Sequence, residues 1–172
     1  MLRLGEKQEL TVVKEVEFGV YLAESMDSND KVLLPKKEVD GEVKKGSTFS
    51  VFLYKDSSDR LIATRREPMV TLGQTAVLKV KEVTRIGAFL DWGLEKDLLL
   101  PFHEQTTKPY PGDEVLVALY LDKSSRLCGT MKVYPYLKKN APYQVNDVVN
   151  GRVYEISDNF GTFVAVDDRY SG

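Results

Sequence analysis

The side chains in this sequence with the most binding chemistry are aromatic rings next to glycines in predicted strands. They are Phe18, Tyr21, Phe89, Phe160 and Phe163. Residues 88–92 alternate as a strand does, so Phe89 and Leu90 point to opposite faces. Because Leu90 suits a core, we expect Phe89 on the solvent side, and the same alternation exposes Tyr21 and Phe163. The competing interpretation is that these rings fill the core. For Phe18 and Phe160, which precede a glycine, the pattern favours neither.

An exposed ring can stack on a nucleobase, which contributes about 1–3 kcal/mol per base when cations nearby contact the phosphates. The candidate phosphate contacts are Lys14, Arg65 and Arg66 in the first half, and Lys81, Arg85 and Lys132 in the second. Any one of them is also typical of an ordinary solvated strand face. The functional interpretation therefore depends on rings and cations sharing a surface, as Phe89 and Lys81 would on neighbouring strands. Arg60 and Arg126 are expected instead to pair with Asp56 and Asp122 of the preceding turns.

Residues suited to catalysis or metal binding are sparse. His103 is the only histidine, which leaves no histidine-based metal cluster. Cys128 has no basic partner near it in sequence, so a buried and unreactive thiol is expected. The sequence has no phosphate-binding glycine loop, dinucleotide fingerprint or nucleophile elbow. We therefore expect a non-catalytic protein with no metal and no cofactor.

Composition narrows the class of protein. The chain of 172 residues is 42% hydrophobic and 29% charged, typical of a globular protein that is neither disordered nor membrane-bound. No apolar run approaches the ~20 residues needed to cross a bilayer. A single cysteine and no signal-peptide core favour the cytoplasm. The net charge of −2 argues against tight, sequence-blind binding of duplex DNA, while leaving room for a local basic strip.

An internal repeat organises the chain. Residues 17–22 (EFGVYL) match 85–90 (RIGAFL), and 33–35 (LLP) match 99–101 (LLP). The stretch 53–61 matches 119–127 in the same order, and a third copy begins near Val145 and reaches Gly172 after only two strands. Matched features in one order indicate a duplicated module. We expect a first module at 1–68, a second at 69–135, and a linker with an incomplete third copy at 136–172.

Each full copy predicts five short strands. They are expected at 9–15, 19–25, 32–35, 48–54 and 61–65, and again at 76–83, 87–92, 97–101, 114–120 and 127–133. A module of this size cannot leave its sheet edges open without cost, and closing into a small barrel removes the edges. The predicted fold is all-β: tandem five-stranded OB-fold barrels followed by a truncated third copy. Short helical turns are expected at 36–39 and 102–105, after each Leu-Leu-Pro.

The incomplete third copy would form a hairpin with open edges, and isolated hairpins are marginally stable. We expect it either to pack on the second copy or to pair with another chain, which would make a homodimer.

The motifs resemble those of a known family. The Phe-Gly-x-aromatic pattern, the Leu-Leu-Pro step and the Asp…Arg-Leu-x-x-Thr last strand resemble S1-type RNA-binding domains. The strings LLPKKEV, FLYKDSSDRLIATRR, GAFLDWGLEKDLLLPFHEQ and FGTFVAVDDRYSG resemble the bacterial conserved virulence factor B family of S1-like proteins. The resemblance implies a cytoplasmic RNA-binding protein with S1 domains in series, of which this chain is an amino-terminal part, followed by a winged-helix domain. Typical S1 domains have a histidine on the RNA face near the positions of Pro35 and Pro101, and this sequence lacks it.

Two functions follow as hypotheses. The first is non-catalytic binding of single-stranded RNA, by base stacking and backbone charge, in post-transcriptional or virulence-gene regulation. The second is a protein-interaction scaffold that docks on the ribosome or the transcription machinery, which the balanced charge and the missing histidine favour. One barrel fold supports both, so the fold alone does not decide between them.

Overall fold

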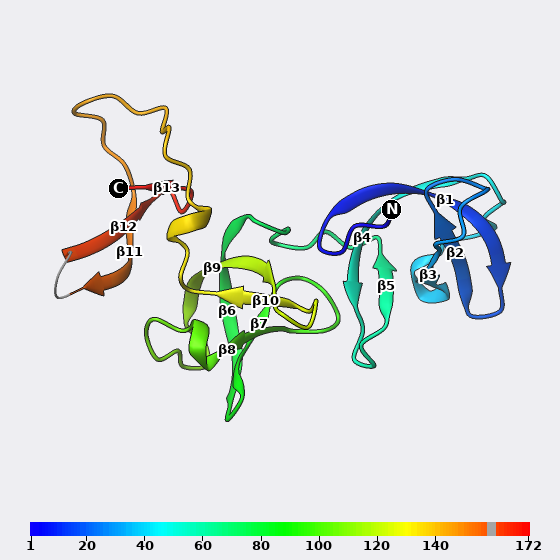
Figure 1. The fold of residues 1–172 in the computed structure, drawn as a ribbon, viewed down its shortest axis with the longest axis horizontal. Coiled ribbons are helices and arrows are strands. Elements are labelled where there is room, and N and C mark those ends of the chain that lie inside the picture. The colour runs from blue at the N-terminus through cyan, green and yellow to red at the C-terminus, as the bar shows by residue number, and fades with distance from the viewer. Residues whose placement is uncertain (158–160) are drawn as a thin grey trace. The chain divides into compact units, whose positions relative to one another are not determined.

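The first repeat forms a closed barrel in a computed structural model that describes residues 1–157 and 161–172. Its strands are β1 (Lys7–Val16), β2 (Gly19–Ala23), β3 (Val32–Pro35), β4 (Thr48–Lys55) and β5 (Leu61–Thr64), with the 3-10 turn η1 (Lys36–Glu38) after β3. The order around the barrel is β1-β2-β3-β5-β4 (Figure 1). β1 pairs with both β2 and β4, and a parallel bridge between Leu33 and Ile62 completes the circle. This confirms the predicted barrel.

The second repeat has the same strand order, although one seam lacks a ladder. Its strands are β6 (Thr75–Thr84), β7 (Gly87–Asp91), β8 (Leu98–Pro101), β9 (Glu114–Leu121) and β10 (Leu127–Thr130), and the 3-10 turn η2 (Phe102–Glu104) follows β8. The sheet runs β10-β9-β6-β7-β8, and the seam lies between β8 and β10. At that seam a Cβ on Gly129 would lie 3.8 Å from the Leu99 carbonyl oxygen, so the two strands are in contact. This barrel is therefore nearly closed.

The third copy is a small sheet that packs on the second barrel. It contains the 3-10 turn η3 (Tyr134–Tyr136) and the strands β11 (Gly151–Ser157), β12 (Gly161–Val166) and β13 (Tyr170–Ser171), in the order β11-β12-β13. Tyr154 and Ala165 from this sheet share one apolar cluster with Leu116, Ala118 and Val133. Of the two expected outcomes for this hairpin, packing on the second copy is the one that the structure has.

Contacts divide the chain into two units. One contains Met1–Pro68 with Gly93–Lys96, and the other contains Met69–Trp92 with Asp97–Gly172. The first barrel has its own core, which includes Leu10, Val12, Leu22, Leu34 and Leu53. These residues come from alternate positions of the strands, as the period of two requires.

One glycine in each barrel allows two strands to approach closely. A Cβ on Gly19 would lie 2.2 Å from the Leu34 carbonyl oxygen, and a Cβ on Gly87 would lie 2.4 Å from that of Leu100. Their φ angles are +154° and +149°, a region that residues with a side chain rarely adopt. A glycine is therefore required at both positions, and the steric reason is backbone contact with the neighbouring strand.

In both barrels a side-chain hydrogen bond connects the short 3-10 turn to the last strand. The hydroxyl of Thr64 donates to a carboxylate oxygen of Glu38 at 2.7 Å, and Thr130 donates to Glu104 at the same distance. Both threonines are almost fully buried, with exposed fractions of 1% and 2%. Each hydroxyl also accepts the amide two residues on, that of Arg66 in the first barrel and that of Lys132 in the second. β10 ends at Thr130, three residues earlier than expected.

Replacing the buried threonine tests this connection. Thr64→Val keeps the side-chain shape but removes the hydroxyl, so Glu38 loses a donor and the amide of Arg66 loses its acceptor. We expect the first barrel to lose about 1–2 kcal/mol of stability in urea unfolding. The matched control is Thr48→Val at the exposed start of β4, which should change stability by less than about 0.5 kcal/mol. Equal losses in both variants would contradict this role.

The close approach of strands can be tested in the second barrel. Gly87→Ala should lower stability by about 3 kcal/mol or more, because the new Cβ meets the Leu100 carbonyl oxygen and the backbone angle is unfavourable. Gly112 is a suitable control because it also has a positive φ, +91°, but a Cβ added there would have no atom within 4 Å. In thermal unfolding, Gly112→Ala should lose much less stability than Gly87→Ala. If the two losses are similar, the backbone angle alone would account for the effect, and the contact with the Leu100 carbonyl oxygen would not contribute.

Candidate nucleic-acid interface

In each of the three copies, a one-residue irregularity in the first strand determines which side chain lies opposite the aromatic residue of the second strand. In the first barrel the register shifts between Val12 and Lys14, which places Lys14 opposite Tyr21. The same shift places Glu82 opposite Phe89. In the third sheet it places Glu155 opposite Phe163. A β-bulge of this kind changes which side chains share a face. The first copy therefore has a cation beside its ring, and the other two have a carboxylate.

The first barrel gathers two rings and two lysines, which we call the barrel-one ring face: Phe18, Tyr21, Lys14 and Lys31. Phe18 is 58% exposed and contacts Tyr21 edge-on, with ring centroids 6.4 Å apart and an interplanar angle of 85°. The ammonium of Lys31 lies 5.2 Å from the Tyr21 ring centroid, within the range of a cation–π interaction. Neither lysine has an ion-pair partner among residues 1–157 and 161–172.

The tyrosine of this face is oriented outward by its strand. Leu22 next to it is fully buried, whereas Tyr21 is half-buried and lies across from Leu33 on β3. The arrangement therefore offers an exposed ring, a partly exposed ring and two positive charges on one side of the barrel. Such a surface can stack bases and attract phosphates.

The corresponding surface of the second barrel is more apolar and carries an acid. Phe89 is half-buried and has Leu99 on one side and Glu82 on the other. Ile86, 57% exposed, stands where the first barrel has Phe18. The structure thus brings Phe89 together with a carboxylate and aliphatic side chains.

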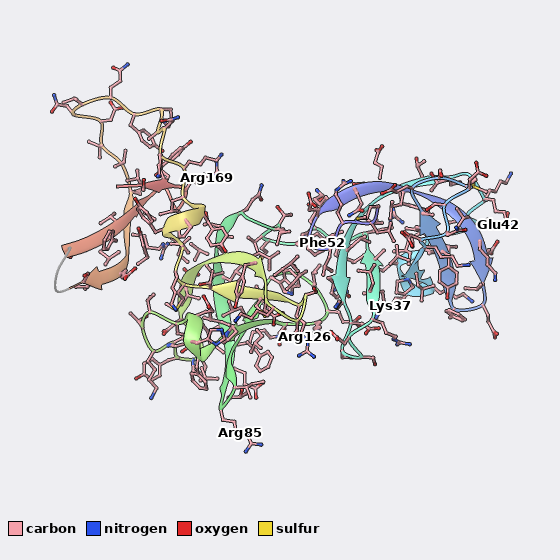
Figure 2. The ribbon with its side chains drawn as sticks, viewed as in Figure 1. Lys37, Glu42, Phe52, Arg85, Arg126 and Arg169 are labelled. Carbon is pink, nitrogen blue, oxygen red and sulfur yellow. The ribbon has the colours of Figure 1, made fainter. Side chains whose placement is uncertain are left out.

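Two cations predicted as phosphate contacts of the second copy, of which Lys81 was expected to share a surface with Phe89, have other surroundings. The ammonium of Lys81, at the bulge, donates to a carboxylate oxygen of Asp97 at 3.0 Å, and this hydrogen bond raises the pKa of Lys81. Arg85 is exposed in the turn between β6 and β7, and Figure 2 shows its side chain at the tip of that hairpin. Lys81 is therefore already neutralised by a partner on its own barrel.

Two other predicted phosphate contacts have structural roles next to the 3-10 turns. The guanidinium of Arg65 lies 4.9 Å from the ring centroid of Phe49 and donates to the Glu38 carbonyl at 3.3 Å. The ammonium of Lys132 donates to the His103 carbonyl at 2.7 Å. Both residues remain exposed, so they keep charge at the surface, but neither joins the barrel-one ring face by a contact described in the structure.

Of the two aromatic residues predicted as contacts in the third copy, the structure describes Phe163. Phe163 packs against Tyr154 and Tyr134, with ring centroids 6.1 Å and 6.2 Å away, and joins the cluster that binds the third sheet to the second barrel. Its ring is therefore engaged in packing. Phe160 lies outside the described residues.

Sequence reasoning missed Lys31. The signal that could have found it is the register between β2 and β3, because Lys31 directly precedes β3, the strand that pairs with Tyr21 through Leu33.

The predicted pairing of Arg60 with Asp56 is confirmed, with the Arg60 Nη2 3.2 Å from the carboxylate. Partial burial raises the pKa of Asp56, but amide donors from Arg60 and Ser58 outweigh it and leave that pKa below its usual value.

Within the described ranges, the structure gives no group of three or more His, Cys, Asp or Glu side chains able to hold a metal ion. In the same ranges no helix is long and apolar enough to cross a membrane.

The fold and its repeated motifs match a known family. A family model described as S1 domain matches residues 4–66 and again residues 72–132, so the chain belongs to the S1 domain family. The resemblance noted in the sequence is thereby confirmed.

Individual relatives extend the comparison. The chain is 27% identical to uncharacterized protein YitL of Bacillus subtilis over 177 residues, covering 97% of this chain and 58% of that protein. It is 31% identical to conserved virulence factor B of Staphylococcus aureus over 110 residues, covering 60% of this chain and 37% of that protein. The chain therefore spans less than two thirds of the length of these relatives.

A solved structure agrees with the fold. It is a multidomain protein with nucleic acid binding domains from Streptococcus pneumoniae, which superposes with a TM-score of 0.64 at 23% identity over 96% of this chain and 60% of that one.

Because Phe18 is exposed and Phe163 is packed, replacing them by alanine should cost different amounts of folding stability. Phe18→Ala should change the melting temperature little, because the ring is mostly exposed. Phe163→Ala should cost about 2–3 kcal/mol, because its ring packs in the cluster shared with the second barrel. Differential scanning calorimetry of both variants measures the contrast. A large loss for Phe18→Ala would show that this ring supports the fold.

Proposed function

We propose that this chain binds single-stranded RNA without catalysis, and that the barrel-one ring face is its principal contact. Phe18 and Tyr21 would stack bases, while Lys14 and Lys31 would neutralise phosphates. The observation that carries the proposal is the register of the first strands. It puts Lys14 beside Tyr21, whereas Glu82 and Glu155 occupy that place beside the other two rings.

Membership of the S1 domain family supports nucleic-acid binding as the general function, and the solved neighbour is itself described as having nucleic acid binding domains. Stacking also suits a chain with net charge −2, since base stacking does not depend on a large positive field. The affinity should be modest, about micromolar, and should weaken as salt rises. A cytoplasmic role in post-transcriptional control fits this chemistry and the staphylococcal relative that is named a virulence factor.

A second candidate applies to the second barrel. Its outer surface combines exposed Ile86 with half-buried Phe89 and Leu99, and Glu82 opposes Phe89. An apolar strip beside a carboxylate repels a phosphate backbone but suits a protein partner. We therefore propose that the module at 69–135 docks a protein, such as a component of the ribosome or transcription machinery, while the module at 1–68 binds RNA.

Fluorescence anisotropy of a labelled oligo-U tests the RNA proposal. A label on the RNA is preferable to Trp92 fluorescence, because Trp92 is only 2% exposed. Phe18→Ala should weaken binding by about 5-fold to 100-fold, the equivalent of one lost stacking contact. Lys14→Glu should weaken it as well, and should reduce the slope of log affinity against log salt by about one or more.

The matched charge change is Glu82→Lys at the equivalent position of the second barrel. It should leave oligo-U binding unchanged or strengthen it, because it creates there the ring-and-lysine pair of the first barrel. Lys81→Gln serves as a further control, since that lysine is paired with Asp97. The proposal fails if oligo-U does not bind, or if Phe18→Ala and Lys14→Glu bind as well as the original chain.

A further inference from the structure

The second unit contains a pocket that is lined by two basic side chains, Lys138 and Arg169, and by no acidic residue. Its residues are distant in sequence from the barrel-one ring face. Its volume is about 400 Å³, within the range of small-ligand sites. One wall comes from Gly73, Gln74 and Thr75, where the chain enters β6, and the other from Tyr136, Lys138 and Arg169. Figure 2 labels Arg169 beside the third sheet.

Charge distinguishes this pocket from three other pockets in the part of the chain that the structure describes. The pocket beside η1 includes Glu38 and Asp40. The pocket beside β11 includes Glu114 and Glu155. In the first barrel, Glu15 lines a third. By contrast, the pocket at Lys138 and Arg169 has two cations and no carboxylate among its lining residues.

The nearby acids are engaged with other partners. The turn between β12 and β13 consists of Asp167, Asp168 and Arg169, so two acids directly precede the arginine. The Asp168 carboxylate accepts from the Nε of Arg152 at 2.7 Å. The Asp167 carboxylate accepts from the hydroxyl of Tyr143. Neither Lys138 nor Arg169 has an ion-pair partner in the part of the chain that the structure describes.

Main-chain hydrogen bonds hold the wall of Lys138 and Arg169 together, and a side-chain hydroxyl joins it to the other wall. The amide of Lys138 donates to the Arg169 carbonyl at 2.7 Å, and the amide of Ser171 donates to the Lys138 carbonyl at 3.0 Å. Across the pocket the hydroxyl of Thr75 donates to the Asp168 carbonyl at 2.7 Å. Because these bonds use the backbone of Lys138 and Arg169, the two charged side chains remain available to a ligand.

We propose that this pocket binds the phosphate group of a nucleotide. The ammonium of Lys138 and the guanidinium of Arg169 would donate to the phosphate oxygens, and Arg169 can do so with two parallel N–H groups. The amide side chain of Gln74 and the ring of Tyr136 line the remaining space, which suits the nucleoside part. The inference is independent of the barrel-one ring face.

Amide-resolved NMR of the whole chain tests the proposal. Inorganic phosphate, uridine 5′-monophosphate and an oligo-U with a 5′-hydroxyl are titrated separately, so that a free phosphate, a nucleotide and an internal phosphodiester are distinguished. Saturable shifts are expected at Gly73, Gln74, Lys138 and Arg169, and the tightest ligand identifies the source of the phosphate. Absence of saturable shifts at these amides with all three ligands would overturn the proposal.

Variants make the test specific. Lys138→Gln and Arg169→Gln should each weaken binding about tenfold, as expected for loss of one charge-assisted hydrogen bond. Arg169→Lys should bind more tightly than Arg169→Gln, because lysine keeps the positive charge, and less tightly than the original chain, because lysine lacks the two parallel N–H groups. Lys139→Gln changes an exposed neighbour that does not line the pocket and should bind as the original chain does. Equal weakening in Lys139→Gln would show nonspecific charge attraction and contradict the site.

The outcome is separable from that of the RNA proposal. Phe18→Ala should keep the phosphate-induced shifts at Gly73 and Lys138 even where it loses oligo-U affinity. Loss of these shifts in Phe18→Ala would contradict an independent pocket. The spectra of the variants also report whether the fold is retained, since the dispersion of the β-sheet amides is visible in the same experiment.

Discussion

The bulge in the first strand of each copy is the constraint on which the binding surfaces depend. It adds one residue between Val12 and Lys14, and the same shift recurs at Val80/Glu82 and Val153/Glu155. Since an extra residue changes which side chains share a face, the bulge fixes the neighbour of the ring on the second strand. One barrel architecture thereby presents a lysine next to a tyrosine in one copy and a glutamate next to a phenylalanine in two others.

The three equivalent rings consequently have three environments. Tyr21 lies beneath the ammonium of Lys31 and against exposed Phe18. Phe89 lies among aliphatic neighbours and an acid, and Phe163 contributes to the packing between the third sheet and the second barrel. Duplication of a module preserves its core because the core determines stability, while outward-facing positions vary without loss of the fold. The duplicated copies therefore carry different surfaces on one strand order.

Much of the fold could be predicted from the sequence, because periodicity, turn residues and the internal repeat all indicate one barrel. The short turns after Pro35 and Pro101 were also predictable. The site was less so: alternation alone treats Lys81 as the companion of Phe89, since it cannot detect a bulge or the hydrogen bond to Asp97. Lys31 was missed because its place depends on the register between β2 and β3. The packing role of Phe163 depends on contacts between elements that no local pattern encodes.

The glycines that touch a neighbouring carbonyl have a consequence for the alignment of strands. Sliding β2 by one residue along β3 would bring Phe18 or Val20 to the position of Gly19, where a Cβ would lie 2.2 Å from the Leu34 oxygen. The misaligned hairpin is thus blocked by repulsion, so the correct alignment does not depend on attraction alone. When fluctuations separate these two strands, the repulsion at Gly19 disfavours closure in a shifted alignment, so it keeps Tyr21 opposite Leu33 on β3.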